Sequence, residues 1–159
     1  MLELMLVRHG EAEFPNSGMT DRRRPLAARG IQDVKRQGDA FPCLPDDHML
    51  VSDAVRTRET FALLTEVWGR VPPHHITTTG YLAEASTWLN LIEMTDPEAH
   101  RLWVIGHNPG ISNLAFRLTG AYVGMATSDI VHIALDVREW TAPLDGAGRL
   151  LGHHPVRNA

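Results

Sequence analysis

Apolar runs of strand length alternate along this chain with segments that have helical spacing. Six runs are short, rich in apolar or β-branched residues and bounded by turn-forming residues, which predicts strands. They are Leu4–Val7, His48–Ser52, Ile76–Thr79, Leu102–Ile105, Ile130–Leu135 and Arg149–Leu151. Helices are predicted over about residues 26–41, from Asp53 to near Gly69, over about 87–94, and from Gly110 to about Gly120. Ser52 or Asp53 is expected to be the N-cap of the second helix.

This alternation predicts an α/β fold with a mainly parallel sheet that is covered by helices on both faces. In this architecture ligands bind beyond the carboxyl ends of the strands. With 159 residues, of which 43% are hydrophobic, the chain is large enough for one globular domain over residues 1–159. Residues 121–129 carry no clear motif, and the polar residues after Gly152 are expected to fray.

Charge and composition narrow the range of partners. The net charge of −4 argues against nucleic-acid binding through a broad basic surface, so the expected ligand is small or locally anionic. No apolar stretch reaches the ~20 residues of a membrane span, so no membrane partner is expected. The single cysteine, Cys43, forms no intramolecular disulfide, and the first residues lack a leader pattern, which favours the cytoplasm.

The histidine pairs at 74–75 and 153–154 invite interpretation as metal ligands. Adjacent residues of an extended strand point to opposite faces, so such pairs rarely hold one ion. No Cys/His spacing matches a closed zinc site. We therefore expect a protein that uses no metal and no other cofactor.

Basic and histidine residues follow three of the predicted strands. The first strand runs into Arg8 and His9, the second is followed by Arg56, and the fourth runs into His107. Each alone is compatible with a structural or solvated role, but the carboxyl ends of parallel strands meet at one sheet edge. A guanidinium suits bidentate phosphate contact, an imidazole is a nucleophile, and Gly10 is free to take backbone angles that a Cβ forbids. The combination predicts a histidine that handles phosphate.

Four segments resemble the motifs of the histidine phosphatase superfamily, also called phosphoglycerate-mutase-like. The resemblance is closest to its short SixA-type phosphohistidine phosphatases. The segments are LMLVRHGEA from Leu4, RPLAARG from Arg24, VSDAVRTRET from Val51 and VIGHNPGIS from Val104. The resemblance implies a three-layer α/β/α sandwich with a mostly parallel sheet.

The resemblance also implies roles for single residues. Arg8, His9, Arg56 and His107 would form the phosphate pocket, with His9 as nucleophile. Arg24 would lie near the pocket mouth, Asn108 is counted among the phosphate-binding residues, and Glu84 in YLAEAS corresponds to the general acid.

The chain departs from the family pattern at two places, of which the first changes a turn and the second bears on the substrate. Asp53 stands where members usually have proline, and Ala12, Glu13 and Phe14 stand where mutases and many small-molecule phosphatases continue into a Trp-Asn pair. The second departure weakens a phosphoglycerate or sugar-phosphate assignment.

The expected chemistry is phosphoryl transfer to neutral His9, followed by hydrolysis of the phosphohistidine. The second ring nitrogen would be held by a backbone carbonyl such as that of Gly10, while Arg8, Arg56 and a protonated His107 hold the phosphoryl oxygens. A phosphohistidine can leave as neutral imidazole, whereas an alkyl ester needs an acid such as Glu84. Together with the small size of the chain, this favours a phosphohistidine-carrying protein as substrate.

Three alternatives remain open. A general phosphomonoesterase acting on a small phosphoester would depend on Glu84. A phosphate- or phosphoprotein-binding module without turnover would form no covalent phosphoenzyme. A phosphodiesterase that uses His9 and His107 as acid and base would form none either.

Overall fold

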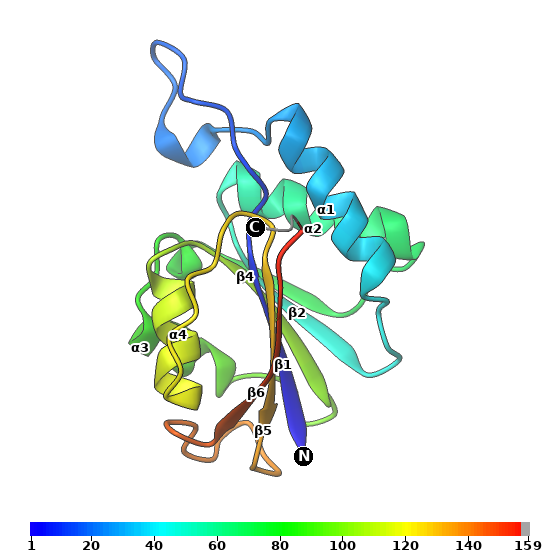
Figure 1. The fold of residues 1–159 in the computed structure, drawn as a ribbon, viewed down its shortest axis with the longest axis vertical. Helices are drawn as coiled ribbons and strands as arrows, with labels where there is room; N and C mark the ends of the chain where they lie inside the picture. Colours follow the sequence, from blue (N-terminus) through cyan, green and yellow to red (C-terminus); the bar gives the residue numbers. More distant parts are fainter. Residues whose placement is uncertain (157–159) are drawn as a thin grey trace.

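The computed structural model, which describes residues 1–156, has one six-stranded sheet with α-helices on both faces (Figure 1). The strands are β1 (Leu2–Arg8), β2 (Asp47–Ser52), β3 (His74–Thr77), β4 (Arg101–Gly106), β5 (Ile130–Leu135) and β6 (Gly148–His154). The helices are α1 (Ala28–Ala40), α2 (Val55–Trp68), α3 (Ala85–Ile92) and α4 (Gly110–Thr119), with short 3-10 turns η1 (Asp21–Arg23) and η2 (Thr78–Gly80).

The strand order is β3-β2-β4-β1-β5-β6. Strands β3, β2, β4 and β1 are parallel to their neighbours, whereas β5 pairs antiparallel with β1 and β6 antiparallel with β5. The prediction of an α/β fold with a mostly parallel sheet is confirmed. Because β2, β4 and β1 are adjacent, the three strand ends that the sequence marked lie side by side.

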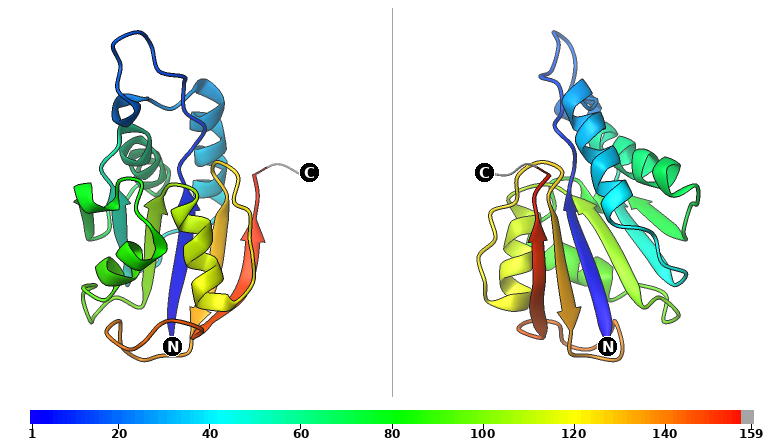
Figure 2. Two further views of the ribbon diagram at one scale, coloured as in Figure 1. Left: turned by 90° about the vertical axis from the view of Figure 1, so that its left-hand side faces the viewer. Right: turned by 45° about the vertical axis from the view of Figure 1, so that its right-hand side comes forward.

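The core consists of two layers of apolar side chains, one on each face of the sheet. Along β1 the fully buried Leu4 and Leu6 belong to the layer under α3 and α4, and Met5 and Val7 to the layer under α1 and α2. The alternation follows from the two-residue period of a strand. Figure 2 shows the same arrangement from two further sides, with α1 and α2 on one face and α3 and α4 on the other.

Two helices end where the sequence predicted, and one begins differently. Gly69 after α2 and Gly120 after α4 take left-handed backbone angles, with φ of 65° and 75°, which a glycine adopts without steric cost. The predicted N-cap of α2 was wrong. The N-cap is Ala54, which makes no side-chain hydrogen bond, because α2 starts only at Val55. The Ser52 hydroxyl instead pairs with the ring of His107, which follows β4.

Two predicted ends also need correction. The third strand lies at 74–77 rather than 76–79, because Thr78–Gly80 turn into η2, where Thr77 Oγ1 accepts a hydrogen bond from the Thr79 amide. The chain does not fray after Gly152, since β6 continues through His154. Side-chain partners from other segments hold this end: His153 Nε2 lies 2.7 Å from Asp129 Oδ2, and Gln37 donates to the His154 carbonyl. Residues 157–159 of the predicted tail lie outside the described part.

Residues 12–24 form an arm that projects beyond the carboxyl end of β1 (Figures 1 and 2). Its base is closed by backbone hydrogen bonds from the Glu13 amide to the Pro25 carbonyl and from the Ala27 amide to the Glu11 carbonyl. No helix among residues 1–156 is long and apolar enough to cross a membrane.

Candidate active site

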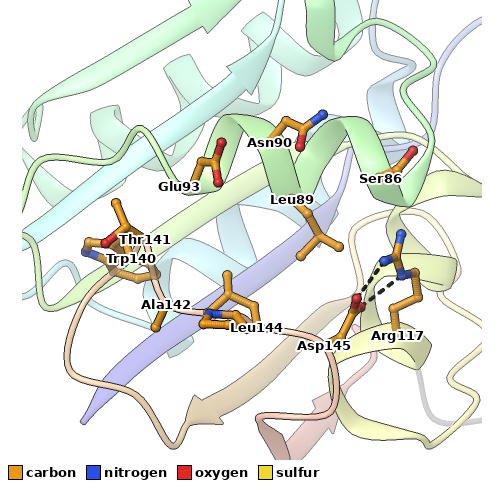
Figure 3. Close-up of a pocket in the computed structure, with 11 residues that line it drawn as sticks. Ser86, Leu89, Asn90, Glu93, Arg117, Trp140, Thr141, Ala142, Leu144 and Asp145 are labelled. Carbon is orange, nitrogen blue, oxygen red and sulfur yellow. Dashed lines mark hydrogen bonds and ion pairs between the residues drawn. The ribbon is translucent and has the colours of Figure 1, made fainter.

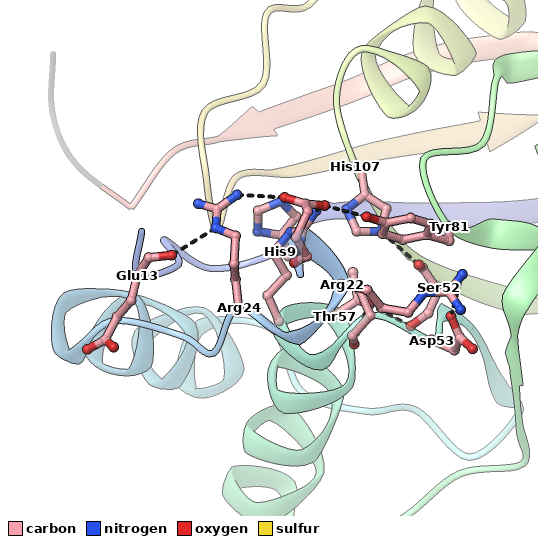
Figure 4. Close-up of polar contacts among 12 residues, drawn as sticks. His9, Glu13, Arg22, Arg24, Ser52, Asp53, Thr57, Tyr81 and His107 are labelled. Atoms are coloured by element: carbon pink, nitrogen blue, oxygen red, sulfur yellow. Dashed lines mark hydrogen bonds and ion pairs between the residues drawn. The ribbon is translucent and has the colours of Figure 1, made fainter. Parts of the chain in front are cut away.

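A pocket of about 340 Å³ opens at the carboxyl ends of β1 and β4. It brings together six of the seven predicted site residues: Arg8, His9, Arg24, Arg56, His107 and Asn108. The remaining lining residues are Glu11, Ala12, Phe14, Leu82 and Thr127. Figure 4 shows the polar contacts around His9 and His107.

His9 follows β1 directly, and its ring is fixed on one side. Nδ1 lies 2.7 Å from the Gly10 carbonyl oxygen, the contact expected from the sequence, and the residue is only 8% exposed. Burial, and secondarily the charges of Arg56, Arg8 and Arg24, lower the pKa of His9 to about 4. The imidazole is therefore neutral at neutral pH, as a nucleophile must be, and Nε2 is the nitrogen left for the pocket.

Gly10 serves a different purpose from the one predicted. It is not among the glycines with positive φ, so unusual backbone angles are not what it supplies. A Cβ at this position would lie 2.9 Å from Val34 Cγ2 and 3.1 Å from the Gly30 carbonyl oxygen. The absence of a side chain thus allows α1 to pack against the segment that carries His9, while the Gly10 amide donates to Thr60 Oγ1 of α2.

His107 follows β4 and faces His9, with 5.3 Å between the ring centroids. Its Nε2 lies 2.7 Å from Ser52 Oγ, and both residues are buried. Burial, followed by the nearby His9 and Arg56, lowers the pKa of His107 to about 3. The expectation of a protonated His107 is therefore wrong for the free protein, because burial disfavours the charged ring and the guanidinium of Arg56 adds to that effect.

Arg8 and Asn108 both donate to the Met125 carbonyl, at 3.0 and 2.8 Å. These contacts assign a place to the 121–129 segment, for which the sequence offered no account: it lies against the pocket and holds the Arg8 guanidinium. The Asn108 amide oxygen accepts from Ser112, so this side chain joins α4 to the 121–129 segment. Asn108 lines the pocket as predicted, but both ends of its side-chain amide are already hydrogen-bonded within the protein.

Arg56 is the second residue of α2 and only 3% exposed. Its Nη1 donates to the Asp21 carbonyl at 2.8 Å and its Nη2 to Asp21 Oδ2 at 3.0 Å. Arg24 joins the same group, because its Nε donates to the Glu13 carbonyl and its Nη1 to Asp21 Oδ1. The arm at 12–24 therefore carries one pocket arginine, Arg24, and the residue that holds a second one, Arg56.

Three buried donor positions of pocket residues have no partner within residues 1–156: Arg8 Nε, Arg56 Nε and His107 Nδ1. Buried polar atoms are rarely left unpaired in a folded protein. The three side chains that carry these positions line one pocket, and guanidinium and imidazole N–H groups match the oxygens of a tetrahedral oxyanion. The arrangement is suited to bind a phosphoryl group beside a neutral imidazole.

Glu84 is the one predicted site residue that the structure does not bring to this pocket. It is the exposed N-cap residue of α3 and lines a separate hollow together with Pro109 and Gly110. Leu82, two residues earlier, lines both hollows. The chain therefore presents Leu82, and not the carboxylate, to the histidines.

A further hollow of about 380 Å³ lies between α3, α4 and the loop that joins β5 to β6 (Figure 3). Leu89 and Leu144 face each other there, and Arg117 is paired with Asp145 at 2.8 Å. The basic group is neutralised by its partner and no histidine lines the hollow, so it lacks the converging donors of the first pocket. No group of three or more His, Cys, Asp or Glu side chains among residues 1–156 is placed to hold a metal ion.

Sequence reasoning missed three contributors to the site, Asp21, Tyr81 and Met125, and it considered Ser52 only at the end of the second strand and as a possible N-cap. Met125 contributes a carbonyl, which any residue supplies, so no signal marked it. Asp21 stands directly before the basic run 22–24, where a lone carboxylate suggests a charge partner. Tyr81 packs edge-on to His107, with 5.6 Å between ring centroids, and its hydroxyl contacts Asp21. Such a contact across sixty positions leaves no local pattern.

Comparison with known proteins places this geometry in a family. The family model of the histidine phosphatase superfamily (branch 1) matches residues 4–111. An uncharacterised protein of Mycobacterium tuberculosis is 33% identical over 164 residues, covering 95% of this chain and all of the relative. A probable phosphoglycerate mutase of Salmonella paratyphi C, GpmB, is 36% identical over 73 residues, which are 43% of this chain and 33% of that protein.

Solved structures show the same fold along the whole chain. SixA from Nakamurella multipartitia matches with a TM-score of 0.83 and 22% identity, covering 98% of this chain and 97% of that one. The protein histidine phosphatase SixA in complex with tungstate matches with a TM-score of 0.79 and 18% identity over 98% and 97% of the two chains. The motif match, the full-length relative and the shared fold agree: the chain belongs to the histidine phosphatase superfamily, a membership that supports phosphatase activity.

Proposed function

We propose that the protein is a phosphohydrolase that transfers a phosphoryl group to His9 and that its substrate is a phosphohistidine side chain of another protein. The observation that carries the proposal is the pairing of His9 Nδ1 with the Gly10 carbonyl at 2.7 Å. This hydrogen bond places the ring hydrogen on Nδ1, so the lone pair of Nε2 is available in a pocket lined by Arg8, Arg56 and His107.

In the first step the Nε2 lone pair forms a bond to phosphorus, and the bond between phosphorus and the substrate nitrogen breaks. The electron pair of that bond stays on the departing imidazole, which leaves neutral because its other nitrogen carries a hydrogen. Arg8 and Arg56 hold the equatorial oxygens, whose charge dominates a loose transition state. One imidazole replaces another on phosphorus, so the step needs no added proton.

His107 acts in this proposal as a neutral donor. We propose that Ser52, whose Oγ lies 2.7 Å from His107 Nε2, donates its hydroxyl hydrogen to that nitrogen, which places the ring hydrogen on the buried Nδ1. This N–H then donates to a phosphoryl oxygen, and its alignment in advance of the reaction is what makes such a donor effective. The low pKa of His107 is compatible with this role, whereas it is not compatible with a resident imidazolium.

In the second step the oxygen of a water molecule bonds to phosphorus while the phosphorus–Nε2 bond of His9 breaks. The electron pair returns to Nε2, and both water hydrogens remain on the product as dihydrogen phosphate, which then ionises in solvent. His9 ends as it began, neutral with its hydrogen on Nδ1 toward the Gly10 carbonyl.

The choice of a protein substrate is supported by the pocket rim. Phe14 and Leu82 line the pocket and are 88% and 54% exposed, so the opening is bordered by accessible apolar surface rather than covered. A side chain presented by a second protein can reach such an opening. The position of Glu84 outside the pocket points the same way, since a phosphohistidine does not require its proton.

A second candidate, a phosphomonoesterase acting on small esters, is favoured by one observation. The carboxylate residue Glu11 lines the same pocket as His9. If the leaving group is an alkoxide, Glu11 is better placed than Glu84 to protonate it. Alkyl phosphate turnover that collapses in Glu11→Gln but persists in Glu84→Gln would establish this reaction.

The test measures phosphate release, with EDTA present, from a phosphohistidine-carrying protein and from an aryl phosphate. We expect wild type to prefer the phosphoprotein and His9→Ala to be inactive on both. His100→Ala is the matched control, because this exposed histidine pairs with Asp46 away from the pocket. Acid-labile phosphate bound to wild type and absent from His9→Ala would identify the covalent intermediate.

Other outcomes would contradict the proposal in different ways. Turnover of the aryl ester alone would replace the phosphoprotein substrate by a small phosphoester. Turnover without a trapped phosphoenzyme would favour acid–base chemistry by the two histidines. Inactivity on both substrates, together with tight tungstate binding, would favour a binding module.

A further inference from the structure

Asp21, which the sequence did not predict as a site residue, contacts two arginines of the pocket and Tyr81. Its carboxylate accepts from Arg24 Nη1 and Arg56 Nη2, each at 3.0 Å, and from the Tyr81 hydroxyl. Its backbone carbonyl accepts from Arg56 Nη1 at 2.8 Å. Figure 4 shows two of these partners, Arg24 and Tyr81, near His9 and His107.

These contacts restrain Arg56 at two points. Both terminal nitrogens of its guanidinium are held, one by the Asp21 carboxylate and one by the Asp21 carbonyl, whereas the buried Nε has no partner within residues 1–156. A guanidinium that is held at its terminal nitrogens cannot rotate freely about its last bonds, so the direction of its Nε–H is fixed. The order that a transition state requires is then present before substrate arrives.

The charge of Asp21 excludes a role as general acid. Tyr81, Arg24 and Arg56 hold the pKa of the Asp21 carboxyl well below its usual range, so the group is ionised and cannot donate a proton to a leaving group. An anion beside the pocket also opposes the binding of a second anion. The Asp21 carboxylate therefore reduces phosphate affinity, so tighter substrate binding is not what it contributes to the reaction.

We propose that Asp21 is a positioning residue of the reaction: its two-point contact orients Arg56 for the transition state, at the expense of ground-state phosphate binding. The inference rests on the proposed phosphatase function and deepens it. Asp21 acts through Arg56 and does not touch the reacting atoms.

The proposal predicts that kcat and phosphate affinity respond in opposite directions. In Asp21→Asn the carboxylate charge is lost and one acceptor becomes a donor, so the contact to Arg56 Nη2 is weakened and only the backbone contact to Nη1 remains as in wild type. We expect kcat on an aryl phosphate to fall about tenfold or more, the usual scale for one misaligned electrostatic contact. The dissociation constant for inorganic phosphate should stay equal or decrease, because a repelling charge has gone.

Asp21→Glu separates charge from geometry. The longer side chain keeps the anion but displaces the carboxylate from Arg56 Nη2, whereas the backbone carbonyl still accepts from Nη1, so phosphate affinity should match wild type while kcat stays reduced. Asp145→Asn is the matched control, because Asp145 forms an exposed carboxylate–arginine pair with Arg117, outside the residues that line the pocket. Its kcat and phosphate affinity should equal those of wild type.

A third readout needs no turnover: the Arg56 Nε–H resonance in an NMR spectrum of the free protein. Wild type should give a sharp, separate signal that broadens or shifts in Asp21→Asn. An unchanged signal, or kcat within twofold of wild type, would overturn the role of Asp21. So would equal losses of kcat and phosphate affinity, which a merely structural defect produces.

The same experiment separates this inference from the proposed function. If wild type shows no phosphatase turnover, the proposed function fails, whereas the Arg56 resonance still decides whether Asp21 orients that side chain. If wild type is active and the resonance is unaffected by Asp21→Asn, the phosphatase assignment stands and the positioning role is wrong.

Discussion

Replacement of Ser52 by alanine tests the assignment of His107 as a neutral donor. Ser52 Oγ lies 2.7 Å from His107 Nε2, with the two residues 0% and 2% exposed. Alanine removes the hydroxyl and leaves the ring nitrogen without a partner in a dry environment. The ring hydrogen is then free to occupy either nitrogen, so the donor that faces the phosphoryl group is present only part of the time.

The magnitude follows from the burial of this pair. A buried polar group that loses its partner costs about 1–3 kcal/mol. If that amount is lost from the transition state, kcat falls about fivefold to 150-fold, because 1.36 kcal/mol corresponds to a factor of ten. The free energy of unfolding should fall by a similar amount, about 1–3 kcal/mol.

The assay combines turnover of an aryl phosphate with urea unfolding and the ring nitrogen shifts of His107. Thr65→Ala is the control, since Thr65 is also a buried hydroxyl, bonded to the Ala62 carbonyl within α2, outside the pocket lining. It should leave kcat unchanged. The reasoning would be refuted if Ser52→Ala kept wild-type kcat, or if the ring hydrogen of wild-type His107 resided on Nε2.

Two further predictions concern stability. Asp47 is 1% exposed and accepts hydrogen bonds from Arg101 and from Trp103 Nε1. Asp47→Ala leaves the Arg101 charge without its partner, so the free energy of unfolding measured in urea should fall by about 3–5 kcal/mol. A loss below about 1 kcal/mol would contradict this prediction. In the folded protein the pKa values of His9 and His107, about 4 and 3, lie below the ordinary 6.5. The unfolded chain therefore binds more protons than the folded protein below pH 6.5, and the free energy of unfolding decreases as the pH is lowered from 6.5 to about 4. Between pH 7.5 and pH 5 each histidine should lower the free energy of unfolding by about 2 kcal/mol. His107→Gln should therefore lose less of this free energy over the same range than wild type does. An equal loss in the two proteins would contradict the lowered pKa of His107.

The elements that could be predicted from the sequence are those whose signal is local. The strand at 130–135 was located to the residue, because its apolar run is bounded on both sides and buried on both faces. Glycines at 69 and 120 end their helices as expected, since the left-handed angle is a property of one residue. Arg8, His9, Arg56 and His107 meet because adjacent parallel strands carry their ends to one edge, which topology alone dictates.

What could not be predicted depends on contacts between distant segments. The β6 end is held by Asp129 and Gln37, which no periodicity near 153–154 reveals. The expected charge of His107 was wrong because burial and the neighbouring Arg56 act only once the chain has folded. The cytoplasmic location, the single domain and the independence from cofactors stay predictions from the sequence.

The charges of the pocket also account for the state of its nucleophile. Burial lowers the pKa of His9 most, and Arg56, Arg8 and Arg24 lower it further, so the guanidinium groups that attract a phosphoryl group also help to keep the imidazole unprotonated. Asp21 acts in the opposite direction on the second histidine, because its anion raises the pKa of His107 and offsets part of the arginine charge there. A pocket with only arginines would bind phosphate more tightly and release it more slowly, whereas a pocket with more carboxylates would allow His9 to become protonated. The observed balance suits a site in which an imidazole must accept a phosphoryl group and then lose it to water.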